Sequence, residues 1–177
     1  MRSGVVLITG IMAAGKSTVA QALAERLPRA AHVRGDVFRR MIVSGRADMR
    51  PGAGDEALAQ LRLRYRLSAA TADAYADEGF TAVVQDVVLG PELAAYMRLV
   101  RTRPRYVVVL APRPDVVAAR EAGRGKTGYG GGWTPERLDK GLREETARIG
   151  LWLDTSGLTV GATVDAILEG ADRALVP

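Results

Sequence analysis

The sequence predicts a three-layer α/β/α fold, in which helices cover both faces of a five-stranded parallel sheet. Short β-branched runs alternate with longer amphipathic segments along the whole chain. The 177 residues are enough for one domain and leave little chain for a second. Apolar residues make up 47% of the chain and charged residues 25%, ordinary values that argue against disorder and collagen-like repeats.

The predicted strands are short apolar runs that end at glycine, aspartate or a turn. They cover residues 5–9, 31–34, 80–85, 106–110 and 151–153. The predicted helices carry apolar residues at helical spacing or begin at a proline or a capping residue. They cover residues 16–27, 36–43, 56–78, 91–100, 114–122, 135–149 and 160–175. Open parallel sheets bind ligands beyond the carboxyl ends of their strands, so Gly10, Asp36 and Asp86, which each follow a predicted strand, are expected to converge on one edge.

Composition and charge exclude several classes of site. Cysteine is absent and His32 is the one histidine, which excludes disulfides, thiolate zinc sites and a His-rich metal site. The net charge of +5 comes mostly from arginine and is compatible with anionic ligands or nucleic acid, and coding bias is the alternative explanation. No stretch is apolar and long enough to span a bilayer, so we expect a cytoplasmic protein with no membrane partner.

The segment Gly-Ile-Met-Ala-Ala-Gly-Lys-Ser at residues 10–17 matches the phosphate-binding pattern G-x-x-x-x-G-K-[ST]. It lies between a predicted strand and a predicted helix, which is the context the pattern requires. Its backbone N–H groups are expected to hold phosphate oxygens, Lys16 to reach the β- and γ-phosphates, and the Ser17 hydroxyl to bind Mg²⁺. The expected nucleotide-binding residues are Gly10, Ile11, Met12, Ala13, Ala14, Gly15, Lys16, Ser17 and Thr18.

Asp36 follows the second predicted strand in the run Arg34-Gly-Asp-Val-Phe-Arg-Arg40. A carboxylate at this place accepts the proton of an attacking hydroxyl in small-molecule kinases. Arg39 and Arg40 are expected to hold an anionic group of the acceptor. The alternative is that Asp36 caps the following helix and the arginines form a solvated face.

Asp86 ends the third predicted strand. An apolar strand that ends in aspartate beside a phosphate-binding loop indicates a Mg²⁺ ligand, acting with Ser17. The alternative is that Asp86 contacts the acceptor, because the turn at residues 87–90 is expected to line the same cleft.

Two later segments are candidates for nucleotide contacts. Residues 123–133 contain six glycines, and we interpret them as a lid in which Arg120 or Arg124 neutralises the transferring phosphoryl group. A surface loop with incidental arginines is the alternative. Thr155 and Ser156 follow the last predicted strand and either border the nucleotide base or only form the turn before the last helix.

Together these motifs resemble the P-loop kinases of small hydroxyl compounds: shikimate, gluconate and adenylylsulfate kinases and chloramphenicol phosphotransferases. The last are the most similar, through Asp36, the segment Val-Val-Gln-Asp-Val-Val-Leu-Gly at 83–90 and the pattern Arg-Glu-x-x-Arg at 120–124. The resemblance covers most of the chain. It implies a P-loop NTPase fold over residues 1–177 with strand order 2-3-1-4-5, ATP and Mg²⁺ as cofactors, and Asp36 as the base. It does not identify the acceptor, because the arginine-rich residues 39–55 match no acceptor pocket of these families.

The predicted function is therefore transfer of the γ-phosphoryl group of ATP to a hydroxyl of a small metabolite or antibiotic. A kinase of nucleotides or nucleic-acid 5′ ends, a nucleotide-dependent switch without acceptor and a zeta-type toxin kinase are the alternatives. Nucleic acid is not expected as a partner, because Arg62, Arg64 and Arg66 cannot share one helix face. The sequence leaves the oligomeric state open.

Overall fold

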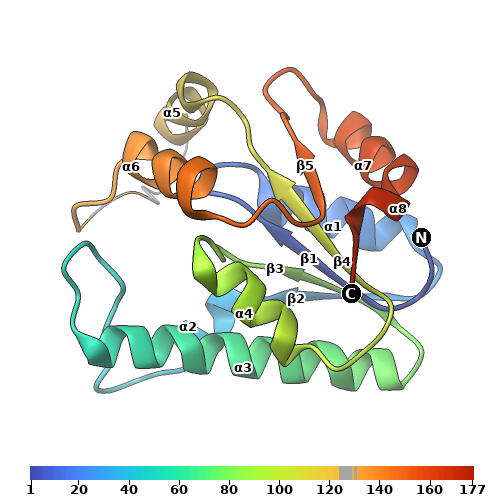
Figure 1. The fold of residues 1–177 in the computed structure, drawn as a ribbon, viewed down its shortest axis with the longest axis horizontal. Helices are drawn as coiled ribbons and strands as arrows, with labels where there is room; N and C mark the ends of the chain where they lie inside the picture. The colour runs from blue at the N-terminus through green and yellow to red at the C-terminus, as the bar shows by residue number, and fades with distance from the viewer. Residues whose placement is uncertain (124–128, 130) are drawn as a thin grey trace.

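A twisted sheet forms the middle layer of the molecule (Figure 1). The structure, a computed structural model, describes residues 1–123, 129 and 131–177. The strands are β1 (Val5–Thr9), β2 (Ala30–Arg34), β3 (Thr81–Gln85), β4 (Arg105–Leu110), β5 (Leu151–Leu153) and β6 (Leu175–Val176). The first five are parallel in the order β2-β3-β1-β4-β5, which confirms the predicted fold class and strand order.

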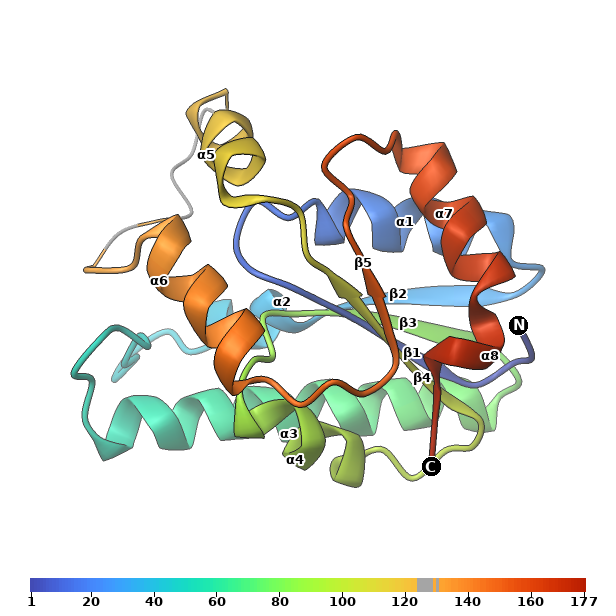
Figure 2. The same ribbon diagram turned by 45° about the horizontal axis from the view of Figure 1, so that its top comes forward.

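Helices cover both faces of the sheet. They are α1 (Lys16–Arg26), α2 (Gly35–Arg40), α3 (Asp55–Asp77), α4 (Pro91–Leu99), α5 (Pro114–Ala122), α6 (Pro135–Lys140), α7 (Val160–Glu169) and α8 (Ala171–Ala174), with a π-helical turn η1 (Gly141–Glu145) after α6. Figures 1 and 2 show α1 and α7 on one face and α3 and α4 on the other, with α2, α5 and α6 gathered near the carboxyl ends of the strands. Among the described residues, no helix combines the length and the apolar character needed to cross a membrane.

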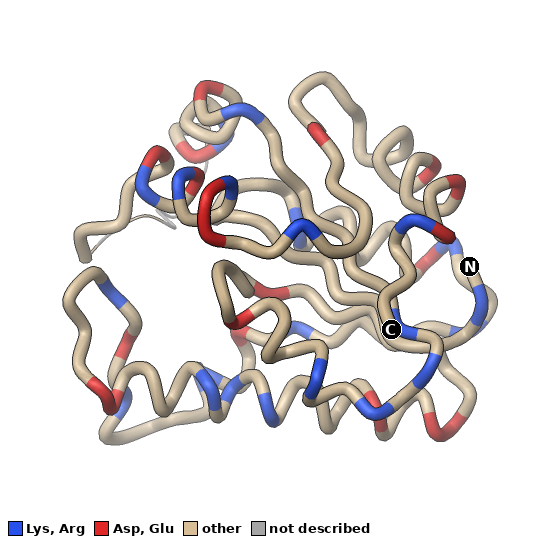
Figure 3. Tube along the Cα trace, in the orientation of Figure 1, with Lys and Arg blue, Asp and Glu red and all other residues tan. Residues whose placement is uncertain are grey.

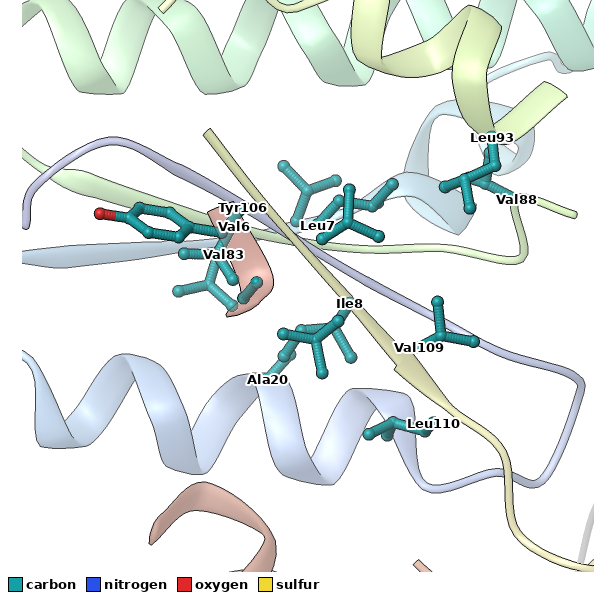
Figure 4. Close-up of a cluster of buried hydrophobic side chains, with 14 of the residues drawn as sticks. Val6, Leu7, Ile8, Ala20, Val83, Val88, Leu93, Tyr106, Val109 and Leu110 are labelled. Carbon is teal, nitrogen blue, oxygen red and sulfur yellow. The ribbon is translucent and has the colours of Figure 1, made fainter. Parts of the chain in front are cut away.

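The core lies between the sheet and these two helical layers. Every residue of β1 is fully buried, because β1 is the central strand and both of its faces are covered. Figure 4 shows Leu7 on the side of the sheet that carries Leu93 of α4, while Ile8 lies on the side of Ala20 of α1. Full burial of such a side chain stabilises the fold by about 1.5–3 kcal/mol. The core therefore fixes the position of the loop that follows β1.

Three helices predicted from the sequence are shorter in the structure. The helix expected over 36–43 ends at Arg40. The helix expected over 135–149 leaves helical geometry after η1, where the extended Thr146 accepts a hydrogen bond from the Gly90 backbone at 2.7 Å. The helix expected over 160–175 ends at Glu169, and after the short α8 the chain forms β6. This last strand pairs antiparallel with Arg105 and Tyr106 of β4 and was not predicted.

Candidate nucleotide and acceptor site

The loop between β1 and α1 has the conformation that phosphate binding requires. Gly10 has φ +146°, and a Cβ there would overlap the Leu110 carbonyl oxygen. Gly15 is left-handed at φ +94° and directly precedes α1, which has no side-chain cap and no acidic residue in its first turn. Ala13 also has a left-handed φ of +61°, a conformation that costs a non-glycine residue of the order of 1 kcal/mol and clusters at functional sites. The loop therefore presents helix N–H groups that suit an anion.

Lys16 and Ser17 begin α1 directly beneath this loop. The Lys16 ammonium group donates a hydrogen bond to the Ile11 carbonyl oxygen at 2.7 Å, across the loop, and its side chain is buried. The Ser17 hydroxyl donates to Oε1 of Gln85 at 3.1 Å. Gln85 is the last residue of β3, so the hydroxyl expected to bind Mg²⁺ faces a side-chain amide rather than the carboxylate of Asp86.

A cavity of about 270 Å³ opens beside the loop. Its walls come from three segments: Ala13, Ala14, Gly15, Thr18 and Val19; Arg120 of α5; and Thr155, Leu158, Val160 and Thr163 after β5. The walls combine apolar side chains with the polar side chains of Thr18, Arg120, Thr155 and Thr163. Six of the predicted nucleotide contacts line this cavity: Ala13, Ala14, Gly15, Thr18, Arg120 and Thr155.

Arg120 connects the segments that line the cavity. Its guanidinium group donates to the Thr155 carbonyl oxygen at 2.9 Å and lies 3.5 Å from the Ala14 carbonyl oxygen. Ser156 is not a lining residue: its hydroxyl accepts from the Arg113 backbone at 2.8 Å and donates to Asp154. The hydrogen bonds that the Ser156 hydroxyl and the Ser156 backbone N–H donate to Asp154 lower the pKa of that carboxyl group. Ser156 therefore holds the 154–157 turn against the start of α5.

The predicted glycine-rich lid is described only in part. Arg124 and three of the six glycines of the segment, Gly125, Gly128 and Gly130, lie outside the described residues. The Tyr129 hydroxyl donates to the Met12 carbonyl oxygen at 2.8 Å, and the indole nitrogen of Trp133 donates to the Met49 carbonyl oxygen at 3.1 Å. These two bonds join the segment to the phosphate loop and to the 44–54 loop.

Asp36 lies in the first turn of α2 and does not cap it, since the cap position is occupied by Arg34 and no side chain accepts a capping bond. Its two carboxylate oxygens bind Arg39 Nε at 3.0 Å and Arg40 Nε at 3.1 Å. Arg39 also donates through Nη1 to Asp48 at 2.7 Å. The bond to Asp48, supported by the one to Asp36, raises the pKa of Arg39, and Arg39 in turn lowers the pKa of Asp48.

Asp86 forms a buried ion pair with Arg64 of α3. Arg64 Nε donates to Asp86 Oδ2 at 2.7 Å, a second guanidinium nitrogen binds Oδ1, and the Val87 backbone also donates to Oδ1 at 2.7 Å. The side chains of Arg64 and Asp86 are 13% and 1% exposed, so removal of either partner is expected to cost about 3–5 kcal/mol. Burial lowers the pKa of Arg64, while Tyr65 and Asp36 raise it.

Gly35 brings these two groups of ion pairs together. The Asp86 carboxylate occupies the space that a Cβ at position 35 would fill, and Asp36 is the next residue. We use the name ion-pair cluster for Asp36, Arg39, Arg40, Asp48, Arg64 and Asp86. The cluster contains the predicted acceptor residues together with Asp48 and Arg64.

The register of the sheet places the cluster beside the phosphate loop. Arg34 pairs with Gln85, and Gln85 pairs with Ile8 on the other side. The ends of β2 and β1 are therefore two strand spacings apart, about 10 Å. The three predicted strand-end positions, Gly10, Asp36 and Asp86, emerge at the same edge.

Sequence analysis does not identify three residues of this site, Asp48, Arg64 and Gln85. Asp48 lies in the segment expected to be a loop, and no local pattern pairs it with Arg39. Nothing local in the sequence distinguishes Arg64 from Arg62 or Arg66, which are more exposed in the structure. The sequence pattern identifies Gln85 only as the end of a strand. Its position next to Asp86, on the strand beside the phosphate loop, was the available signal.

Comparison with solved structures supports the same fold. The chain is similar to a sugar kinase from Janibacter sp. HTCC2649, with TM-score 0.69, 18% identity and coverage of 97% of this chain and 96% of that one. It is similar to the Mycobacterium tuberculosis APS kinase in complex with AMPPNP and APS, with TM-score 0.65, 17% identity and coverage of 97% and 98%. It is also similar to a gluconokinase from Sinorhizobium meliloti 1021, with TM-score 0.64, 18% identity and coverage of 98% and 94%. The predicted resemblance to small-molecule kinases is confirmed at the level of the fold.

Comparison of sequences gives the family. No curated protein matches the chain. A family model described as an AAA domain matches residues 5–143, which include the phosphate loop, the ion-pair cluster and α5. The chain therefore belongs to the AAA-domain family of P-loop proteins.

Proposed function

We propose that this chain, as one domain, is a kinase that transfers the γ-phosphoryl group of ATP to a hydroxyl group of a small molecule. The observation that carries the proposal is the shared sheet edge: a phosphate loop follows β1, and a half-exposed carboxylate, Asp36, follows β2. Three similar folds are named as a sugar kinase, an APS kinase and a gluconokinase, and one of those structures contains AMPPNP.

Each group of the loop has a role in this reaction. The N–H groups of the loop and of the first turn of α1 hold the β-phosphate, and Lys16 leaves the Ile11 carbonyl to bind the transferring phosphoryl group. The nucleoside base of ATP occupies the cavity beside Arg120. The hydrogen bonds of Arg120 to the Ala14 and Thr155 carbonyl oxygens hold two walls of this cavity together. Most of the rate enhancement comes from positioning and charge neutralisation.

Magnesium fits the residues that face the phosphates. In the described part of the chain no group of three acidic or histidine side chains could hold a metal ion alone. The ion would therefore be held by phosphate oxygens of the nucleotide together with the Ser17 hydroxyl. Gln85 orients that hydroxyl. Asp86 would not bind the ion directly, because Arg64 already binds both of its carboxylate oxygens. Bound magnesium would neutralise charge on the phosphates.

Asp36 receives the acceptor. Its carboxylate orients the attacking hydroxyl and accepts its proton as the new O–P bond forms and the bond to ADP breaks. Arg39 and Arg40 hold the carboxylate by one oxygen each, which fixes the direction from which a hydroxyl approaches.

The experiment is a screen of hydroxylated metabolites and antibiotics for compounds that stimulate ADP release from MgATP. Stimulation by at least one compound is expected, with one phosphorylated product per ADP. The Lys16→Ala variant should lose the stimulation, and Lys140→Ala, which changes an exposed lysine on α6, should keep it. A nucleotide-dependent switch would instead bind ATP and show no stimulation by any acceptor.

A further inference from the structure

The face of α3 that points away from the core is apolar. The residues that α3 buries are Ala57, Tyr65, Ser68, Ala69, Ala72 and Asp73. At 3.6 residues per turn, the opposite side of the helix carries Leu63, Leu67, Ala70 and Ala74, and all four are exposed. We call these four residues the outer stripe. A surface helix normally places charged and polar residues on this side, so the outer stripe departs from the pattern of a helix that meets only water.

The neighbours of α3 lie on its flanks and leave the outer stripe open. On one flank Arg62 Nη2 binds Glu92 of α4 at 2.8 Å. On the other flank Gln60 donates to the Gly45 carbonyl oxygen at 2.8 Å, which ties the helix to the loop after α2. Figures 1 and 2 show α3 at the edge of the molecule, with the sheet and α4 on its inner side. Leu63 and Leu67 therefore remain 36% and 41% exposed.

The spacing and the sizes of the four residues fit a second copy of the same helix. Positions i, i+4, i+7 and i+11 form the seam along which two helices pack. The two leucines occupy the first half of the seam and the two alanines occupy the second half. In an antiparallel pair, Leu67 of one copy faces Ala70 of the other, and Leu63 faces Ala74. Each large side chain then meets a small one, so that the two helices touch along the whole stripe.

A parallel pair would not fill the same space. It would place leucine against leucine at one end of the stripe and alanine against alanine at the other, which leaves a gap at the alanines. The outer stripe is thus complementary to itself in the antiparallel direction, as the interface of a twofold dimer requires.

The charges on the α4 flank favour the same direction. Figure 3 shows basic positions in the middle of α3 and acidic positions toward its C-terminal end. In the antiparallel register, Arg62 of one copy lies about 3 Å along the axis from Asp77 of the other, on the same flank. In a parallel pair these two residues would be about 22 Å apart along the axis and could not meet.

Arg62 and Asp77 already have partners within the chain. Arg62 binds Glu92 at 2.8 Å, and Asp77 lies 3.5 Å from Arg101. Contact between two copies would join these exposed ion pairs into one network, which adds direction more than affinity. The apolar seam is therefore the main source of binding energy.

We propose that two copies of this chain associate through their outer stripes, with the two α3 helices antiparallel about a twofold axis. The stripe is about 17 Å long, so the helix pair is a small interface, and a Kd of about 1–100 µM is expected. This proposal does not depend on the reaction proposed for the chain.

The test is sedimentation equilibrium of the protein from about 5 to 200 µM, a range that brackets the expected Kd. The wild type should show a reversible monomer–dimer equilibrium, and Leu67→Lys should raise the Kd at least about tenfold. Leu175→Lys, which changes an exposed leucine on β6, is the matched control and should dimerise like the wild type. A wild type that stays monomeric up to 200 µM, or equal dimerisation of Leu67→Lys, would overturn the proposal.

Mixing variants tests the direction of the helices. Leu67→Lys and Ala70→Glu should each dimerise poorly alone, and an equimolar mixture should regain association because the introduced lysine faces the introduced glutamate. A mixture of Leu67→Lys and Leu67→Glu pairs the charges that a parallel arrangement would bring together. The first mixture should associate more tightly than the second. Equal association of the two mixtures, or the reverse order, would overturn the antiparallel arrangement.

Discussion

The carboxylate of Asp86 lies against the backbone of Gly35, in the space that a Cβ at that position would fill. Because Asp36 follows Gly35, this contact connects the buried Arg64–Asp86 ion pair to the carboxylate proposed to receive the acceptor. A residue with no side chain thus sets the distance between the end of β3 and the start of α2. Any side chain at position 35 would therefore overlap the Asp86 carboxylate.

Gly35→Ala is expected to destabilise the protein and reduce turnover. The added methyl group overlaps the Asp86 carboxylate, so either α2 or the ion pair must shift, at a cost of about 1–3 kcal/mol. Urea unfolding and kcat with an acceptor measure the two effects. Gly161→Ala in the first turn of α7, where the nearest atom is 3.9 Å from the new Cβ, is the control and should be neutral or slightly stabilising. Wild-type stability and turnover in Gly35→Ala would contradict the proposed contact.

Asp36→Asn is expected to leave ATP binding unchanged and to lower acceptor-dependent turnover by about 10²–10⁴-fold. The amide keeps the shape of the side chain but cannot accept the proton of the attacking hydroxyl. Steady-state kinetics and an ATP titration on the same preparation separate the two effects. Full turnover in this variant would remove Asp36 from its assigned role.

Arg120→Ala is expected to weaken ATP binding by about tenfold, because the guanidinium group lines the cavity proposed to hold the nucleoside and is bonded to the Ala14 and Thr155 carbonyls. Titration with ATP measures the change in Kd. Arg98→Ala, an exposed arginine on α4, is the control and should bind ATP like the wild type. Equal affinity of both variants for ATP would show that the nucleoside base of ATP binds outside this cavity.

Sequence predicted the fold well where local patterns determine structure. The run at β1 is apolar throughout and ends in a phosphate-loop motif, so periodicity and motif agree there. Sequence failed at the C-terminal end, where residues 171–176 continue an apolar helical pattern but form α8 and β6. Pairing of β6 with β4 depends on residues about 70 positions apart, and no local signal reports it.

The candidate site was predictable in its motifs and not in its ion pairs. Gly10, Asp36 and Asp86 could be assigned to one edge because each follows a strand of a parallel sheet. The binding of Arg64 rather than Arg62 or Arg66 to Asp86 follows from which face of α3 packs over β3, and that face is set by tertiary contacts. The choice of ion-pair partners is therefore a result of the structure.

Equilibrium binding of labelled ATP in the presence of Mg²⁺ tests the central claim most directly, that the loop at residues 10–17 holds a polyphosphate. The account predicts saturable binding at one site per chain, competition by ADP, and a large loss of affinity in Lys16→Ala. Absence of saturable ATP binding to the wild-type protein would contradict it.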